Sequence, residues 1–449
     1  MKSNLLPFLL AAALSSVASL FAKDTAEPVR LQIDLDRAIL PAGTTEHAVV
    51  KIGLDCLRPP RHGTRPPVNL SLVIDRSGSM SGDKIAKARE AALELVRRLG
   101  PDDIISLVAY DTEVDVLVPA QRVRQARGLE AAICSLEARG NTALYGGVSC
   151  GAAEVRRHAE DRRYVHRVIL LSDGQANVGP SSPEELGRLG ASLVREGISV
   201  TTIGLGLGFN EDLMTRLAQR SDGNTYFVAE SSELPGIFAA ELGDVLNVVA
   251  RKVVIEIDFP AGVRPLNFVG RDGVIRGQRA ELTLNQLYGG QEKFALVEVE
   301  VDPSEPGSER EIARARVSYE DAVSSRSATL NASRKVQFST DRRVVISSAD
   351  HKVQADYAAN ALAVAKDKAI ALVDAGRKDE AGQMLALQAQ ELKTLGDTYG
   401  NAAVSQSAAA AAPEADRLAR EGLDNAKRKA YRTESSQVKA QQSSPGSRP

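Results

Sequence analysis

The spacing of apolar residues divides this chain into four stretches. From Val29 to Leu57, and again from about Val248 to Val345, apolar and polar residues alternate, which is typical of strands with one buried face. From Asn69 to about Val245, continuous apolar runs alternate with segments whose apolar residues recur every three or four positions. From Val353 to Gly396 only the helical spacing remains. The pattern therefore predicts β, α/β, β and helical stretches in that order.

The α/β stretch predicts a mostly parallel sheet with helices on both faces, because its strands are apolar throughout. The predicted strands are Leu70–Ile74, Asp103–Tyr110, Val114–Val118, Arg167–Leu171, Ile198–Gly204 and Asn224–Val228. The predicted helices are Lys84–Leu99, Leu129–Glu137, Leu144–His158, Pro183–Arg195, Asn210–Gln219 and Ser232–Asp244. Asp103–Val118 has the form of a hairpin and is the expected antiparallel edge.

The strands before residue 67 have no partners nearby in the sequence, so we expect them to join the later β segment. The predicted fold is therefore an α/β, doubly wound, mostly parallel sheet inserted in a β-sandwich, with a helical segment at the C-terminal end. A third C-terminal helix is predicted from Pro413 to Ala430. The expected divisions are a signal peptide (1–22), N-terminal sandwich strands (23–67), the α/β domain (68–245), the sandwich (246–347), a helical hairpin or bundle (348–432) and a disordered polar tail (433–449).

The first residues have the form of an export signal. Lys2 is followed by a mostly apolar stretch from Leu5 to Leu14 and then by small residues up to Ala22. The protein is therefore expected to be periplasmic or secreted. The alternative is an N-terminal membrane anchor, although Leu5–Ala22 is barely long enough to cross a bilayer. No later segment is long and apolar enough to span one, so no integral membrane span is expected after signal removal.

Composition narrows the classes of partner. The formal net charge is −2 over 449 residues, so no strong basic field favours nucleic acid. Aromatic residues make up 4% of the chain and Trp is absent, which disfavours stacking platforms for bases or sugars. Among the three cysteines, Cys134 and Cys150 flank a turn and either form a disulfide in an oxidising compartment or, with Cys56, are small buried residues.

Oxygen-bearing side chains gather where three predicted elements end. Asp75, Ser77 and Ser79 lie in the turn between the first strand and the first helix, Thr142 precedes another helix, and Asp173 follows the strand Arg167–Leu171. Ligands bind at this edge of open α/β sheets, and carboxylate and hydroxyl oxygens suit a hard cation such as Mg²⁺. We therefore expect the five side chains to converge on one metal site.

These residues resemble the metal-ion-dependent adhesion site (MIDAS) of von Willebrand factor type A (VWA) domains. The family pattern is Asp-x-Ser-x-Ser, a distant Thr and a distant Asp, and all five positions match over a resemblance that runs from Asn69 to about Asp244. The whole arrangement also resembles bacterial secreted VWA proteins and, more loosely, inter-α-trypsin inhibitor heavy chains. The resemblance implies that Ser77, Ser79 and Thr142 ligate Mg²⁺ (or Mn²⁺ or Ca²⁺), with Asp75 and Asp173 acting directly or through water.

The implied function is metal-dependent protein binding or adhesion, in which a protein partner supplies a Glu or Asp carboxylate to the metal. One alternative is an envelope assembly protein that makes contacts through the sandwich and C-terminal helices. A metal-assisted hydrolase is a remote alternative, and we expect no enzyme activity because no His is placed to act as a base at the strand ends.

Two nearby features leave other roles open. Arg76 occupies the variable position of the motif and either contacts an acidic partner or points to solvent. The run Gly204-Leu205-Gly206-Leu207-Gly208 lacks the spacing and the lysine of a phosphate-binding loop, so we expect a mobile loop after the strand rather than a nucleotide site.

Overall fold

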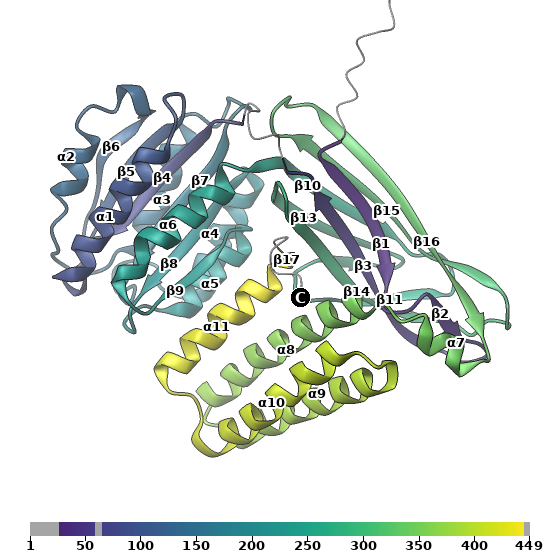
Figure 1. The fold of residues 1–449 in the computed structure, drawn as a ribbon. Helices are drawn as coiled ribbons and strands as arrows, with labels where there is room; N and C mark the ends of the chain where they lie inside the picture. Colours follow the sequence, from purple (N-terminus) through teal and green to yellow (C-terminus); the bar gives the residue numbers. More distant parts are fainter. Residues whose placement is uncertain (1–26, 59–64, 444–449) are drawn as a thin grey trace, which may run out of the picture.

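The computed structural model describes residues 27–58 and 65–443, which form an α/β domain, a β-sandwich and a C-terminal set of helices (Figure 1). The predicted signal segment 1–22 and residues 444–449 of the predicted tail lie outside the described residues. Among the described residues, no helix is both long and apolar enough to cross a membrane.

The α/β domain is built on a six-stranded sheet in the order β6-β5-β4-β7-β8-β9. Only β5 and β6 pair antiparallel, at the edge that the sequence predicts. The strands are β4 (Val68–Asp75), β5 (Ile104–Tyr110), β6 (Val114–Arg122), β7 (Val165–Ser172), β8 (Ile198–Leu205) and β9 (Thr225–Val228).

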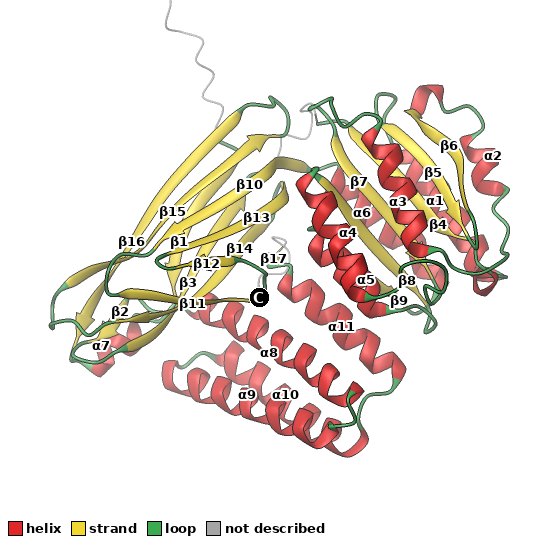
Figure 2. Ribbon diagram, turned by 180° about the vertical axis from the view of Figure 1, so that it is seen from behind, coloured by secondary structure: helices red, strands yellow, loops and turns green. Residues whose placement is uncertain are grey.

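Helices cover both faces of this sheet. One apolar core packs α1 (Asp83–Arg98), α2 (Leu129–Cys134) and α6 (Leu234–Val245) on the face seen in Figure 1. A second core packs α3 (Leu144–Arg156), α4 (Pro183–Arg195) and α5 (Glu211–Arg220) on the opposite face, which is turned toward the viewer in Figure 2. Alternate residues of β4 serve the two cores: Leu72 packs in the first and Val73 in the second. The burial of both faces explains why its strands are apolar throughout.

The sandwich consists of two sheets with one shared core. The first sheet contains β1 (Val29–Leu35), β3 (Glu46–Cys56), β14 (Glu292–Val301), β11 (Val263–Val269) and the short β17 (Gln442–Ser443). The second contains β12 (Val274–Arg276), β13 (Arg279–Tyr288), β10 (Val248–Asp258), β15 (Glu309–Asp321), β16 (Ser327–Ser339) and β2 (Ile39–Pro41). Because β3 pairs with β14 along its whole length, the α/β domain is inserted in the sandwich, which confirms the predicted fold class.

Buried polar contacts join the α/β domain to the sandwich. The Arg167 guanidinium donates to Gln286 Oε1 at 2.7 Å and to the Tyr288 hydroxyl across the boundary. Within the α/β domain it lies 3.6 Å from the Glu241 carboxylate, and both side chains are fully buried. The junction is therefore specified by directional contacts as well as by apolar packing.

The C-terminal helices differ from the prediction. The structure contains α7 (Arg342–Ser347), α8 (His351–Asp374), α9 (Lys378–Tyr399), α10 (Ala402–Glu421) and α11 (Asn425–Lys439). The predicted helix from Pro413 to Ala430 is wrong, because Pro413 lies inside α10 and the chain turns at Gly422, whose φ is +73°. The exposed Pro413 is tolerated because residues on both sides of it, such as Ala408 and Leu418, continue one buried stripe.

The predicted disordered tail is also wrong for residues 433–443. These residues form the second half of α11 and β17, which pairs with β14. Within this stretch Lys439 pairs with Asp367 of α8. Arg432, just before it in α11, pairs with Asp367 and, at 2.8 Å, with Asp212 of α5. The helix is thus held to the α/β domain by charge rather than by an apolar stripe.

Candidate metal centre

The parallel pairing of β4 and β7 creates the candidate site. Ile74 lies opposite Leu171, so the two strands end side by side, at Asp75 and Ser172. Asp75 and Asp173, which are separated by nearly a hundred residues in sequence, thereby become neighbours at one sheet edge. Asp75 is fully buried and Asp173 is 1% exposed.

Asp75 organises the turn that follows it. Its Oδ1 accepts a hydrogen bond from the Ser77 backbone N–H at 2.8 Å, and its Oδ2 accepts one from the Ser172 hydroxyl at 2.6 Å. Burial raises the pKa of Asp75, while the hydrogen bonds from Ser172 and Ser77 lower it in part. The turn is anchored by Met80, which is buried in the core under α1.

The remaining predicted side chains lie beside this turn. Ser77 Oγ is 3.1 Å from Ser79 Oγ, and the Ser79 hydroxyl donates to Asp173 Oδ1 at 2.7 Å. A β-carbon placed on Gly174 would lie 3.0 Å from Thr142 Oγ1 and 3.5 Å from Ser79 Oγ, so Thr142 closes the group from the other side. The structure therefore brings together all five residues that the sequence analysis selected.

The Thr142 loop is fixed by contacts with its neighbours. The Gly78 N–H donates to Gly140 O at 3.0 Å, and the Thr142 N–H donates to Asn177 Oδ1 at 2.8 Å. Gly140 has a φ of +68°, a conformation that favours glycine. These bonds tie the three loops of the site to one another.

The donor set fits a hard divalent cation. Within the described residues, no three His, Cys, Asp or Glu side chains gather in a manner that could hold a metal, so a soft or zinc-type cluster is not found there. The group at the strand ends instead combines three hydroxyls with two carboxylates, the oxygen chemistry that Mg²⁺ prefers. Ser79 is exposed while Asp75 is buried, so the group opens to solvent on the serine side.

Lys84 belongs to this cluster, and the sequence analysis missed it. Its ammonium forms an ion pair with Asp173 Oδ2 and lies 3.3 Å from the Ser79 carbonyl oxygen. Lys84 is the second residue of α1, where the helix dipole disfavours a cation. A lysine in the first turn of a predicted helix, beside a predicted cation site, is the sequence feature from which this contact could have been found.

Arg76 does not point to solvent. It is 7% exposed and forms ion pairs with Asp111, at 2.7 Å, and with Asp115. The Glu113 backbone N–H donates to Asp111 and lowers the pKa of that carboxyl against the effect of burial. Arg139, which donates to Asp111 at 2.9 Å, lowers it further. Since the Arg76 guanidinium is satisfied inside the protein, its role is to hold the loops behind the site.

The glycine-rich run forms a wall of the site. Gly204 and Leu205 end β8, and a β-carbon on Gly208 would lie only 2.6 Å from the Asp173 carbonyl oxygen. Gln175 Nε2 donates to Gly208 O at 2.7 Å. The glycine thus permits a close approach of two backbones at the candidate metal centre, and this explains its position better than the predicted mobile loop.

The same run is also held from outside by α11. Asn425 Nδ2 donates to Leu207 O at 3.0 Å, and the Lys429 ammonium donates to Phe209 O and to Glu211. Arg428 pairs with Glu211 and, at 2.7 Å, with Asp212 in the first turn of α5. One face of this loop therefore contacts the candidate site while its other contacts are made by the C-terminal helix.

All three cysteines are free. Cys56 is buried, Cys150 is half-buried and Cys134 is exposed, so the interpretation of all three as buried residues is wrong for Cys134. It is the last residue of α2 and lies next to the buried Ile133, which faces the core in its place.

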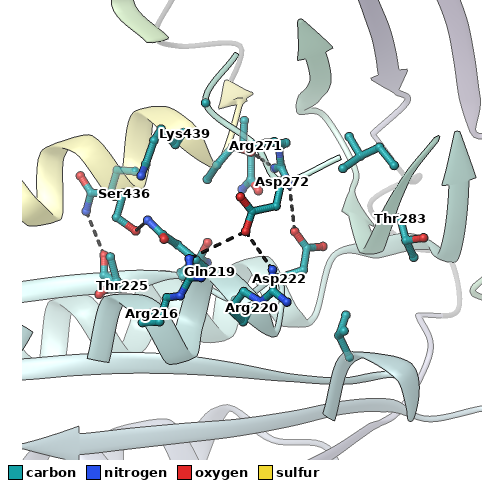
Figure 3. A pocket seen from close by; sticks show the side chains of 18 of the residues that line it. Arg216, Gln219, Arg220, Asp222, Thr225, Arg271, Asp272, Thr283, Ser436 and Lys439 are labelled. Atoms are coloured by element: carbon teal, nitrogen blue, oxygen red, sulfur yellow. Dashed lines mark hydrogen bonds and ion pairs between the residues drawn. The ribbon is translucent and has the colours of Figure 1, made fainter. Parts of the chain in front are cut away.

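A separate cavity of about 620 Å³ lies where α5, the sandwich and α11 meet (Figure 3). It shares no residue with the five predicted ligands. Two ion pairs at its lining cross from the α/β domain to the sandwich: Asp272 with Arg220 at 2.9 Å and Asp222 with Arg271 at 3.3 Å. The cavity is therefore lined by the contacts that join the three parts of the chain.

Comparisons with known proteins agree with this fold. A sequence model of the von Willebrand factor type A domain matches residues 69–240. An uncharacterized protein of Synechocystis sp. is 30% identical over 273 residues, which is 59% of this chain and 64% of that protein. Human inter-alpha-trypsin inhibitor heavy chain H4 is 28% identical over 242 residues, which is 51% of this chain and 25% of that protein. The chain thus spans less than two thirds of the length of each of these relatives.

Two solved structures extend the likeness beyond the α/β domain. A von Willebrand factor type A protein from Catenulispora acidiphila superposes with a TM-score of 0.65 at 18% identity, covering 84% of this chain and 88% of that one. The ArnB paralog VWA2 from Sulfolobus acidocaldarius gives 0.60 at 17% identity, covering 92% and 98%. At these identities the likeness concerns the fold alone. Residues 69–240 of this chain form a von Willebrand factor type A domain.

Proposed function

We propose that this protein binds a protein partner through a Mg²⁺ ion (or Mn²⁺ or Ca²⁺) at Asp75, Ser77, Ser79, Thr142 and Asp173, with a partner Glu or Asp carboxylate completing the coordination. VWA domains are typically interaction or adhesion modules and generally not enzymes, so the class of function follows from the domain itself. The observation that carries the finer proposal is the convergence of five oxygen side chains from three loops at one sheet edge, where Ser79 is exposed.

The hydrogen bonds within the cluster favour neutral ligands. Ser79 donates its hydroxyl proton to Asp173, so Ser77 is the donor in the contact between the two serines and one lone pair of Ser79 remains for a cation. Both oxygens of Asp75 already accept hydrogen bonds. Ser77, Ser79 and Thr142 would therefore hold the ion, with the two carboxylates balancing its charge directly or through water. A bound ion would supply an electrophilic position at the surface for an incoming carboxylate.

The proposal includes export. The apolar N-terminal segment supports a periplasmic or secreted location, where a surface binding module would meet its partners. Cell fractionation with an antibody to the C-terminal helices tests this part independently, and a cytoplasmic location would contradict it.

Metal binding is tested with a double variant, Ser77→Ala with Ser79→Ala. We expect the parent protein to bind Mg²⁺ in isothermal titration and the double variant to lose that binding while keeping its far-ultraviolet circular dichroism. The matched control is Ser135→Ala with Ser192→Ala, which removes one hydroxyl at the C-cap of α2 and one from α4, both away from the site. Equal Mg²⁺ binding by all three proteins would refute the metal site.

The carboxylate part is tested on proteins of the envelope fraction. Capture by the immobilised protein should require Mg²⁺, fail with EDTA or the double variant, and fail after the carboxyl groups of the fraction are amidated with a carbodiimide. Capture that persists after amidation would mean that the partner contributes something other than a carboxylate.

A further inference from the structure

Lys84 makes contacts that helix stability does not explain. Its ammonium pairs with Asp173 Oδ2 and lies 3.3 Å from the Ser79 carbonyl oxygen. A β-carbon placed on Gly206 would lie 3.8 Å from the same ammonium, so Lys84 is also in van der Waals range of the glycine-rich run. The Asp173 side chain has no exposed surface, whereas that of Lys84 is 34% exposed. Lys84 thus reaches inward from the first turn of α1 to a buried carboxylate.

The first turn of α1 is an unfavourable position for a lysine, so Lys84 needs a further reason to be there. The N-terminus of a helix carries partial positive charge, which stabilises acidic residues and disfavours Lys. Asp83, the preceding residue, follows the ordinary preference. Lys87, one turn further on, pairs instead with Glu90 at 2.7 Å on the helix surface. Lys84 is therefore distinguished from its neighbours by its contact with Asp173.

Both oxygens of Asp173 are engaged by this arrangement. Oδ1 accepts from the Ser79 hydroxyl and Oδ2 from Lys84, so the carboxylate is held in one orientation. The ammonium also offsets one of the two negative charges of the cluster. With Lys84 present, a divalent ion and its two carboxylates would form a cluster with one net positive charge. Without Lys84, the two carboxylates would neutralise the ion.

We infer that Lys84 is a positioning residue that orients Asp173 and lowers the affinity of the site for the metal, so that a bound ion keeps its attraction for a partner's carboxylate. This inference rests on the proposed function. It gives Lys84 opposite effects on the two binding steps: it weakens binding of the cation and strengthens binding of the anionic group that follows.

The test uses Mg²⁺ alone and the full chain. Lys84→Met removes the ammonium but keeps the length of the side chain, and should bind Mg²⁺ about tenfold more tightly in isothermal titration, because a like charge near the ion is lost. Lys84→Arg retains the charge and should bind as the parent does. Lys87→Met removes a lysine from the same helix without touching Asp173 and should also bind as the parent does.

A second measurement separates charge from general damage. Without metal, Lys84→Met should melt at a lower temperature than the parent, because Asp173 loses its counter-ion while remaining buried. Saturating Mg²⁺ should close this gap. Unchanged or weaker Mg²⁺ binding by Lys84→Met, or an equal gain in Lys87→Met, would overturn the inference while leaving the proposed function intact. Absence of Mg²⁺ binding by the parent protein would instead overturn the proposed function.

Discussion

Gly208→Ala tests whether the glycine-rich run is a structural wall of the proposed metal centre. The substitution adds a single methyl group to the loop between β8 and α5. That methyl carbon would lie 2.6 Å from the Asp173 carbonyl oxygen, and the obstructing atom belongs to the backbone. A side chain could rotate away from such a contact, but here either the loop or Asp173 has to move.

The structure sets the size of the effect. Relieving the contact requires a shift of roughly half an ångström to one ångström, and overpacking of this kind typically costs about 1–3 kcal/mol. The shift acts on a residue whose carboxylate is fixed by Ser79 and Lys84. Because Mg²⁺ demands near-ideal octahedral geometry, we expect Mg²⁺ affinity to fall by about tenfold or more.

The assay compares two glycine substitutions. Gly236 lies on the exposed side of α6 with open space at its β-carbon position, so Gly236→Ala should be neutral or stabilise the protein by about 0.5–1 kcal/mol. Urea unfolding and Mg²⁺ titration are measured for the parent and both variants. If Gly208→Ala unfolds at the same urea concentration as Gly236→Ala and binds Mg²⁺ like the parent, the wall is not rigid and the reasoning fails.

Three further predictions concern the frame around the site. Glu241→Ala should reduce the free energy of unfolding by about 3–5 kcal/mol, because it leaves the buried Arg167 guanidinium without its carboxylate; a loss below about 1 kcal/mol in urea unfolding would contradict this. Burial, followed by the charges of Arg251 and Lys252, lowers the pKa of His166 to about 4. The neutral form stabilises the protein fully above pH 6.5, and that stability is lost as the pH falls toward 4, by about 2 kcal/mol at pH 5. His166→Gln should remove this part of the pH dependence of the urea midpoint. An unchanged pH dependence in the variant would contradict the prediction. Deletion of residues 424–449 should increase amide hydrogen exchange in residues 206–212, since α11 supplies contacts to that loop, and unchanged exchange would show that the loop stands alone.

The α/β domain could be predicted closely because its apolar pattern and its topology agree. The strand that contains Leu72 is buried on both faces. Ser182 immediately precedes α4, and its side chain caps the helix together with Glu185. The periodicity there determines type and length, and the predicted bounds Pro183–Arg195 coincide with those of α4. Parallel strand order then places Asp75 beside Asp173 with no further information.

The C-terminal helices could not be predicted in the same manner. The sequence pattern predicts that a helix begins at Pro413, but Pro413 lies inside α10 because the packing of Ala411 and Ala415 against α9 outweighs its local preference. In α11, polar residues are satisfied by partners more than two hundred positions away, such as Glu211 for Arg428. Likewise Lys84 and Arg76 have roles that depend on carboxylates reached only in three dimensions. Single-sequence patterns do not record these pairings.

The contact between α11 and the site loop has a consequence for the order in which the protein is made. Asn425 and Leu207 are 218 positions apart, so the loop leaves the ribosome long before the helix that holds it. During that interval the strands of the VWA domain are complete, but Glu211 and Asp212 lack Arg428. A chain interrupted before Asn425 would therefore carry every proposed ligand and still present the wall beside them without its outer support.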